Sequence, residues 1–543
     1  PDDAGAGRDA GHRADAGQRT DAGHRVDGGL PDAGPPLNPG DAGAADVYLT
    51  VRADQPTHHI SPLIYGTNQP HQPDQARYGL VRMGGNRLTC FNWENNASNA
   101  GSDYNYQNDD YLVMELPSGQ RGTAGAAVKS RLDVASGLGA ALLVTVPIVD
   151  LVAADRNGGG DVRNTPNYLD TRFRKNKARK GAPLSLTPDT SDDSVAQDEF
   201  IHWLRANAGE VPIVVSLDNE PDLWSDTHEQ VHPTPVTYTE LVERSIAYAS
   251  GVKSAWPEVP VTGFVSYGWA GYVNLQDASD AQGRGEFIDY FLAQLAAASA
   301  TEGRRLVDYL DLPWYPEARG NGRIIGTDTS AASVRARVQA PRSLWDPAYE
   351  ETSWVRDYVG GPVNLLPRLK AKIAAHWPGT RLAFTEWNYG AGGHISGGVA
   401  VADVLGIFGR EEVGLASYWK LNGEEPWAEA AFAAFRNFDG AGAAFGDTSL
   451  VATTSDTEAT SIYASLDAAD PQRVVLVVIN KDTASHDAAL TLTHGTAFSR
   501  LRVFTLTGDA AALRAGPDIT ASDTNAFRAT LPPLSVSVLV PMP

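Results

Sequence analysis

The chain has 543 residues, 42% of them hydrophobic, and a formal net charge of −22, which indicates a soluble protein too long for one ordinary core. The negative charge makes nucleic acid and anionic membranes poor partners, whereas a neutral substrate remains compatible with it. Cys90, the single cysteine, excludes an internal disulfide and a cysteine-built metal site, and the sequence has no apolar run long enough to span a membrane.

The first 45 residues carry a six-residue repeat of the form DAGxRx. Asp-Ala-Gly recurs at residues 3, 9, 15 and 21, and Asp-Gly-Gly follows at 27. Large apolar residues are confined to Val26, Leu30 and Leu37, so the segment cannot offset the entropy lost on ordering. Residues 1–45 are therefore predicted to be a disordered, low-complexity tether.

Residues 46–60 begin with a strand pattern. Val47, Leu49 and Val51 alternate with polar residues, as expected for a strand with one buried face. No partner strand follows nearby in the sequence. We therefore assign this strand to the all-β domain predicted at the other end of the chain.

Residues 61–438 alternate short apolar runs with helical patterns. The runs lie at 63–67, 78–83, 141–149, 212–217, 259–266, 306–312, 381–387 and 415–420. Eight strands that alternate with helices predict an α/β fold, a (β/α)8 barrel. From residue 439 to 543 the pattern becomes all-β, with strands expected near 473–480, 488–494, 501–508 and 534–540, and we predict a small β-sandwich there.

Two glutamates follow apolar runs of the barrel. Glu220 in SLDNEPDLW ends the fourth predicted strand, and Glu386 in FTEWNYG ends the seventh. Active sites of such barrels lie at the carboxyl ends of the strands, so both side chains should reach the same mouth. A pair of carboxylates suits glycosidic bond cleavage, in which one is protonated and the other ionised.

The chain also resembles glycoside hydrolase family 44, a family of endo-β-1,4-glucanases and xyloglucanases. The resemblance rests on GTNQ, GGNRLTCFNWENNASNAGSDY, SLDNEPDLW, SYGWAGY, WYPEA, QAPRSLWDP and FTEWNYG, between about residues 60 and 420. It implies a barrel with an attached β-sandwich and a retaining mechanism, with Glu220 as acid/base and Glu386 as nucleophile. We expect a secreted or surface-tethered monomer that acts on β-glucan polysaccharide.

Other residues are candidates for the substrate site. Asn219 could hold a sugar hydroxyl or cap its loop. Arg82 could keep Glu386 ionised or form a structural ion pair, and Tyr315 could donate a hydrogen bond to Glu386. Four tryptophans could stack under glucose rings or belong to the core, and at least two are expected in the cleft: Trp93, Trp269, Trp345 and Trp419.

Two features bear on the local chemistry. Pro313 stands before Trp314 and Tyr315 where related barrels often have His-x-Tyr, which removes an imidazole and a backbone donor. No cofactor is required, and no His-Glu-x-x-His spacing occurs. A structural calcium is possible at Asp150, Asp155 and Asp161 or at Asp189, Asp192 and Asp193, which could equally be solvated loop acids.

Two alternatives to a glucanase, and the role of the predicted sandwich, remain open at this stage. The same two glutamates would serve a related hydrolase that acts on mannan or xylan. A non-catalytic polysaccharide-binding protein would be expected to have lost one of them. The predicted sandwich has few aromatic residues, and a structural role fits it better than a role as a binding module.

Overall fold

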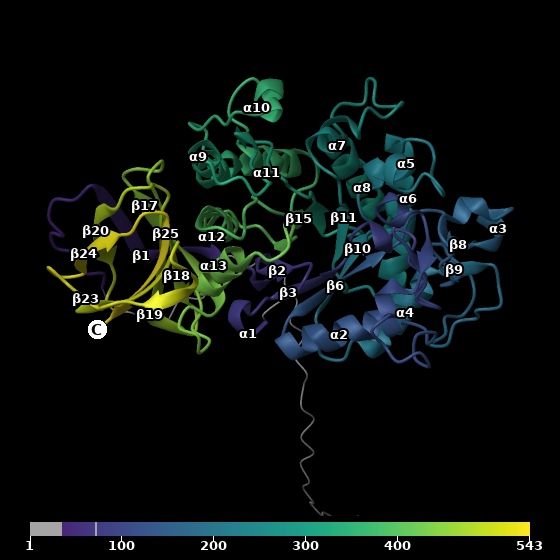
Figure 1. Ribbon diagram of the computed structural model, residues 1–543, viewed down its shortest axis with the longest axis horizontal. Coiled ribbons are helices and arrows are strands. Elements are labelled where there is room, and N and C mark those ends of the chain that lie inside the picture. Colours follow the sequence, from purple (N-terminus) through teal and green to yellow (C-terminus); the bar gives the residue numbers. More distant parts are fainter. Residues whose placement is uncertain (1–34, 71–72) are drawn as a thin grey trace, which may run out of the picture.

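The computed structural model describes residues 35–70 and 73–543, so residues 1–34 of the predicted tether lie outside the described part. Its centre is a closed, parallel barrel of eight strands in the order β10-β11-β12-β15-β16-β2-β3-β6 (Figure 1). They are β2 (Gly66–Thr67), β3 (Leu80–Met83), β6 (Ala141–Val146), β10 (Ile213–Leu217), β11 (Val261–Phe264), β12 (Tyr309–Asp311), β15 (Arg381–Trp387) and β16 (Leu415–Tyr418). Each lies within one predicted apolar run, and the predicted (β/α)8 barrel is confirmed.

The helices that follow the barrel strands cover its outside. They are α1 (Pro73–Ala76), α2 (Ala126–Leu138), α4 (Gln197–Asn207), α6 (Tyr238–Ala255), α8 (Phe287–Glu302), α11 (Leu365–His376), α12 (Ile395–Arg410) and α13 (Pro426–Arg436). Helix α6 begins where the Thr237 hydroxyl accepts a hydrogen bond from the Glu240 backbone N–H at 3.1 Å, which satisfies one free donor of its first turn. No helix in the described ranges is long and apolar enough to cross a bilayer.

Long connections leave the carboxyl ends of the strands and contain short elements of their own. These elements are β4 (Ser98–Asn99), β5 (Asn108–Asp109), β7 (Leu151–Ala153), α3 (Tyr168–Thr171), β8 (Phe173–Lys177), β9 (Ser194–Ala196), α5 (Trp224–Thr227), α7 (Trp269–Asn274), β13 (Arg319–Gly320), β14 (Gly322–Arg323), α9 (Ala331–Gln339) and α10 (Trp354–Val359). The connections surround the mouth at which active sites of such barrels lie.

The second domain is one continuous sheet, ordered β22-β21-β25-β19-β18-β17-β1-β20-β24 with β23 paired to β21. Its strands are β1 (Val47–His59), β17 (Thr448–Thr454), β18 (Thr460–Asp467), β19 (Asp470–Asn480), β20 (His486–Thr493), β21 (Arg500–Thr507), β22 (Ala510–Ala515), β23 (Ile519–Thr520), β24 (Ala526–Leu531) and β25 (Ser535–Met542). Strand β1 pairs antiparallel with β17 and parallel with β20, so the start of the described chain completes the C-terminal sheet.

Strand β19 explains how the two domains join. Val474, Leu476 and Val478 belong to the core of the sandwich, whereas Val475, Val477 and Ile479 belong to the core that includes the barrel helices. All six side chains are fully buried, and this accounts for the unbroken apolar run in the sequence. Figure 1 shows the sandwich beside α12 and α13, on one flank of the barrel.

The boundary of the predicted tether at residue 45 is wrong. Residues 37–45 lie against the sandwich, where the Leu37 N–H donates to the His494 carbonyl at 2.9 Å and the Gly40 N–H donates to the Thr524 carbonyl at 2.7 Å. Ala42 is buried in a small cluster with Ala489 and Ala526. Backbone hydrogen bonds and the small side chain of Ala42 order this stretch. The prediction counts only large apolar residues, so it takes neither contribution into account.

A chain that begins at residue 46 should therefore be less stable than one that begins at residue 35. We expect its Tm to be about 1 °C lower, because a loss near 1 kcal/mol has that effect in a chain of about 500 residues, whose unfolding entropy is about 2 cal/mol/K per residue. Thermal unfolding of the two truncated chains, followed by circular dichroism, measures the difference. Equal Tm values would show that the contacts of residues 37–45 do not stabilise the sandwich.

Candidate active site

The turn that carries Glu220 follows directly from a buried strand. β10 is buried along its whole length, and the chain reaches Glu220 three residues later. Asp218 and Glu220 both adopt the left-handed backbone region, with φ of 61° and 42°. This conformation costs a non-glycine residue about 1–3 kcal/mol, so surrounding contacts must hold the turn.

Hydrogen bonds to the loops that follow β3, β6 and β11 provide that support. The Asp218 carboxylate accepts from the Thr89 hydroxyl at 2.6 Å and from the Ile148 backbone N–H at 2.6 Å. The Glu220 N–H donates to the Val265 carbonyl at 2.9 Å, in the loop after β11. Burial raises the pKa of Asp218 to about 6, although the hydrogen bonds it accepts act in the opposite direction. The backbone of Glu220 is thus fixed.

Glu386 lies inside β15 and is 6% exposed. Its carboxylate accepts from Arg82 Nη1 at 2.7 Å and from the Tyr315 hydroxyl at 2.9 Å. The buried Arg82 side chain also donates to Asn68 Oδ1 at 3.0 Å and to Asn219 Oδ1 at 2.7 Å. The structure thus brings Arg82 and Tyr315 to Glu386, whose carboxylate accepts one hydrogen bond from each and forms an ion pair with the arginine.

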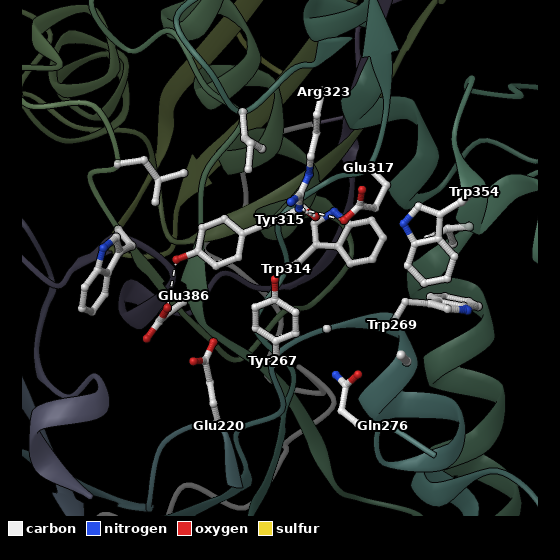
Figure 2. Close-up of a pocket in the computed structure, with 16 residues that line it drawn as sticks. Glu220, Tyr267, Trp269, Gln276, Trp314, Tyr315, Glu317, Arg323, Trp354 and Glu386 are labelled. Atoms are coloured by element: carbon white, nitrogen blue, oxygen red, sulfur yellow. Dashed lines mark hydrogen bonds and ion pairs between the residues drawn. The ribbon is translucent and has the colours of Figure 1, made fainter. Parts of the chain in front are cut away.

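The two glutamates have different environments. Burial, the charge of Glu386 and the charge of Asp222 raise the pKa of Glu220 well above its ordinary value, while Arg82 acts in the opposite direction. Within the described part of the chain no side chain donates a hydrogen bond to the Glu220 carboxyl. Figure 2 shows the carboxyl groups of Glu220 and Glu386 next to each other. One site therefore contains a carboxyl that favours its proton and a second carboxyl group that forms an ion pair with a buried arginine.

Both glutamates line a pocket of about 440 Å³. Its walls contain six aromatic side chains (Figure 2): Tyr267, Trp269, Trp314, Tyr315, Trp354 and Trp419. Arg323 and Glu317 also line the pocket, and they form an ion pair at 3.0 Å. A pocket with paired charges and flat rings suits an uncharged sugar chain, whose C–H faces pack against aromatic rings.

Two of the four candidate tryptophans line the pocket and two do not. Trp269 and Trp419 line the pocket. The predicted sugar-stacking role is wrong for Trp93, which is fully buried with its ring stacked on Phe200 at 5.5 Å. It is also wrong for Trp345, which packs against the core with the guanidinium of Arg410 4.1 Å from its ring centroid. Trp93 thus belongs to the core and Trp345 is half-buried outside the pocket lining, which the sequence around them does not reveal.

Asn219 does not line the pocket. It is 2% exposed; its amide oxygen accepts from Arg82 at 2.7 Å and its amide nitrogen donates to Asn86 Oδ1 at 3.0 Å. These contacts use one N–H of the amide, and the role of Asn219 in holding a sugar hydroxyl stays a prediction. In the structure Asn219 links the loop after β3 to the arginine that contacts Glu386.

Sequence reasoning missed several residues of the pocket wall. Tyr267 follows β11 as closely as Glu220 follows β10, so its position at a strand end was a usable signal. Trp314 adjoins the candidate Tyr315, and the backbone N–H of Trp314 donates to the backbone carbonyl of Glu386 at 2.8 Å. Trp354 is in α10, inside the long connection between β12 and β15, and no local pattern predicts that it reaches the pocket.

Pro313 does not leave the sixth strand end without a hydrogen-bond network. The Tyr272 hydroxyl donates to the carbonyl of Pro313 and, at 3.2 Å, to that of Leu312. Indole Nε1 of Trp314 donates to the Tyr389 hydroxyl at 3.3 Å. Tyr315 can therefore keep its orientation toward Glu386 without the imidazole of related barrels.

The two aspartate clusters proposed for calcium do not form in the structure. In the first, each carboxylate pairs with a different arginine: Asp150 with Arg244, Asp155 with Arg172 and Asp161 with Arg163. In the second, Asp193 pairs with Lys175, and Asp189 and Asp192 accept from backbone N–H groups of Ser191 and Ser194. Nowhere in residues 35–70 and 73–543 do three or more His, Cys, Asp or Glu side chains form a group that could hold a metal ion.

Comparison with known proteins gives consistent matches. Residues 97–318 match the family model described as glycoside hydrolase family 44. Endoglucanase A of Paenibacillus lautus is 39% identical over 517 residues, which are 92% of this chain and 73% of that protein. A β-mannanase/endoglucanase A of Caldicellulosiruptor saccharolyticus is 41% identical over 461 residues, which are 80% of this chain and 34% of that protein.

Among solved structures, a family 44 xyloglucanase of Paenibacillus polymyxa in complex with xyloglucan has a TM-score of 0.88 and 38% identity. The match covers 92% of this chain and 99% of the xyloglucanase chain. It therefore includes both the barrel and the sandwich. The chain belongs to glycoside hydrolase family 44 and is a glycoside hydrolase of the endoglucanase or xyloglucanase type.

Proposed function

We propose that the protein is a secreted, retaining endo-β-1,4-glucanase that hydrolyses internal bonds of cellulose-type glucans and xyloglucan. The observation that carries this proposal is the difference between the two glutamates. Glu386 is paired with Arg82 and Tyr315, whereas Glu220 has a raised pKa and no hydrogen bond to its carboxyl from any described side chain. A retaining glycosidase requires this pair of states before the first step.

In the first step the Glu386 carboxylate attacks the anomeric carbon. The bond from that carbon to the leaving oxygen breaks, and the Glu220 carboxyl gives its proton to that oxygen. The product is a covalent α-glycosyl ester of Glu386. Formation of the ester removes the negative charge of Glu386, which was one of the causes of the raised pKa of Glu220.

In the second step Glu220 acts as a base. The pKa of Glu220 falls once the carboxylate of Glu386 has become a neutral ester, so the carboxylate form of Glu220 is favoured. Glu220 takes a proton from water, the oxygen of that water attacks the anomeric carbon, and the ester bond to Glu386 breaks. Two inversions at the anomeric carbon leave a β-configured product.

The pocket lining and the similar proteins support the proposed substrate and compartment. The aromatic walls suit an uncharged, flat sugar chain, and the similar proteins are named as endoglucanases and a xyloglucanase. Such a polymer does not cross a membrane, so an enzyme that cleaves it must meet it outside the cell. This reasoning supports secretion or attachment to the cell surface.

Stereochemistry and product profile test the proposal together. We expect ¹H NMR of a fresh digest of soluble glucan to show the β-anomer first, and products of intermediate length to appear early. A panel should rank carboxymethylcellulose, xyloglucan and mixed-linkage glucan above mannan and xylan. A fresh α-anomer would contradict the retaining mechanism, and faster hydrolysis of mannan or xylan would contradict the substrate assignment.

A further inference from the structure

One buried carboxylate beside the acid/base residue has no part in the mechanism above. Asp222 lies two residues after Glu220, is 4% exposed and does not line the pocket. Its carboxylate accepts from the Tyr267 backbone N–H at 3.0 Å, from the Ser266 hydroxyl at 3.0 Å and from Gln276 Nε2 at 3.3 Å. A buried charge is tolerated only with such compensation, so these donors are part of what keeps Asp222 in place.

All three donors lie between residues 266 and 276, and two of them belong to one wall of the pocket. Tyr267 and Gln276 line the pocket, and so does Trp269 of α7, which lies between them in the sequence. Figure 2 shows Tyr267 between Glu220 and the pair formed by Trp269 and Gln276. Because Glu220 also donates its backbone N–H to Val265, the Glu220 turn and the loop after β11 are joined at two points.

We propose that Asp222 is a positioning residue that fixes this wall against the Glu220 turn and places a negative charge near the Glu220 carboxyl. The inference rests on the proposed acid/base role of Glu220. It extends that role by naming a residue, outside the pocket surface, that sets both the geometry and the protonation of the acid.

Electrostatics agree with the geometry. The principal charged groups that face Glu220 are Glu386 on β15, Asp222 on its own turn, Arg82 on β3 and Asp103 in the loop after β3. The three carboxylates raise the pKa of Glu220 and Arg82 lowers it. Removal of the Asp222 charge should therefore lower the pKa of Glu220, so that the acid loses its proton, and the enzyme its activity, at a lower pH.

The packing of α7 shows how closely Asp222 is confined. A Cβ atom added at Gly271 would lie 2.1 Å from Asp222 Oδ2 and 2.1 Å from Ser266 Oγ. Such distances are far below van der Waals contact, so a side chain at this position must displace the carboxylate or the wall. Gly271→Ala therefore disturbs the position of Asp222 while its charge remains.

Glu425, beside the part of the pocket wall that contains Trp419, offers a matched control. Glu425 is also fully buried, and it accepts from the Tyr418 hydroxyl at 2.5 Å and from the Asn422 and Leu421 backbone N–H groups at 3.0 Å and 3.2 Å. It thus anchors the loop that carries Trp419. Glu425 is not among the principal charges that act on Glu220, so its neutralisation should disturb a wall without altering the acid.

The decisive experiment compares Asp222→Asn with Glu425→Gln in the full chain. The pH dependence of kcat/KM on soluble glucan reports ionisation of the free enzyme. The alkaline limb of this profile is the fall of kcat/KM at high pH, where Glu220 loses its proton. For Asp222→Asn we expect this limb to move to lower pH by about 0.5 to 1 unit, because one neighbouring like charge is removed. For Glu425→Gln we expect an increase in KM and an alkaline limb that stays in place. An unmoved limb in Asp222→Asn, or an equal shift in both variants, would overturn the inference.

Gly271→Ala tests positioning separately from charge. We expect KM to rise about threefold or more, through misplacement of the wall, with a smaller shift of the alkaline limb than in Asp222→Asn. Gly137→Ala in α2 is the control, since an added Cβ there meets nothing within 4 Å. Unchanged kinetics in Gly271→Ala would remove the positioning role. If Gly271→Ala does not fold, Asp222→Ala replaces it, and an unchanged KM in that variant would overturn the same role.

A dinitrophenyl cello-oligosaccharide separates failure of this inference from failure of the proposed function. Its leaving group needs no proton, so the alkaline limb of kcat/KM should disappear in the parent enzyme. If the limb persists, it does not report Glu220, and the acid role itself fails. If the limb disappears with this substrate but stays unmoved on glucan in Asp222→Asn, only the inference about Asp222 fails.

Discussion

Replacement of Glu386 by Gln is expected to slow hydrolysis of soluble β-1,4-glucan by roughly 10⁴- to 10⁶-fold, the scale that follows loss of a catalytic nucleophile. Gln has nearly the shape of Glu, so its amide oxygen can still accept from Arg82, while its amide nitrogen can donate to the Tyr315 hydroxyl oxygen. The loss then comes from the missing negative charge that attacks the anomeric carbon. Initial rates of reducing-end release measure the effect, and an unchanged Tm shows that the fold is intact.

Tyr315→Phe is the matched control for this variant. It removes one of the two hydrogen bonds to Glu386 and leaves the nucleophile in place, so a loss of about 10- to 100-fold is expected for one bond to a charged group. Equal losses in Glu386→Gln and Tyr315→Phe would contradict the assignment of Glu386 as the nucleophile.

Azide identifies the nucleophile directly. Glu386→Gly opens space on the face from which the carboxylate attacked, so added azide should form an α-glycosyl azide from a substrate with a good leaving group. Glu220→Gly should instead form a β-glycosyl azide, because azide then replaces water in the second step. NMR of the two products decides the assignment, and a reversed pair of anomers would exchange the roles of the two glutamates.

Replacement of Glu220 by Gln is expected to have the second large effect, which depends on the leaving group. With natural glucan the poor leaving oxygen needs a proton, so kcat/KM should fall by roughly 10²- to 10⁴-fold. With a dinitrophenyl leaving group the fall in kcat/KM should be less than about tenfold, since kcat/KM reports the first step alone. The ratio of the two losses is the measurement.

The raised pKa of Glu220 also predicts how the activity of the parent enzyme changes with pH. Burial and the charge of Glu386 raise the pKa of Glu220, and the protonated form is the active acid. Activity on glucan should therefore persist through neutral pH and fall as the pH rises through that raised pKa. The alkaline limb should be absent from Glu220→Gln. Similar losses on both substrates, or a retained limb, would contradict the acid role.

The sequence by itself determined the barrel, because strand and helix patterns are local. Each apolar run that predicted a strand of the barrel contains one, and burial on both faces is what makes such a run continuous. Glu220 and Glu386 could be singled out for the same reason, since each polar residue stands directly after a buried strand. Arg82 on β3 and Tyr315 after β12 could be placed near Glu386 on the same argument.

Tertiary structure alone decided which aromatic residues meet the substrate pocket. Trp93 and Trp269 have no distinguishing local pattern, yet one is in the core and the other in the pocket wall. Trp354 reaches the pocket from a long connection. The path of such a connection depends on contacts between residues far apart in the sequence, and strand and helix periodicity contains no information about them.

The same limit applies to charged residues. Asp155 and Asp161 resemble cation ligands in the sequence, but each meets an arginine in the fold. Asp222 resembles an ordinary loop acid, and only packing of the loop after β11 and of α7 makes it a buried neighbour of Glu220. A carboxylate is recognisable from sequence, whereas its burial and its partners depend on which distant segments the fold places beside it.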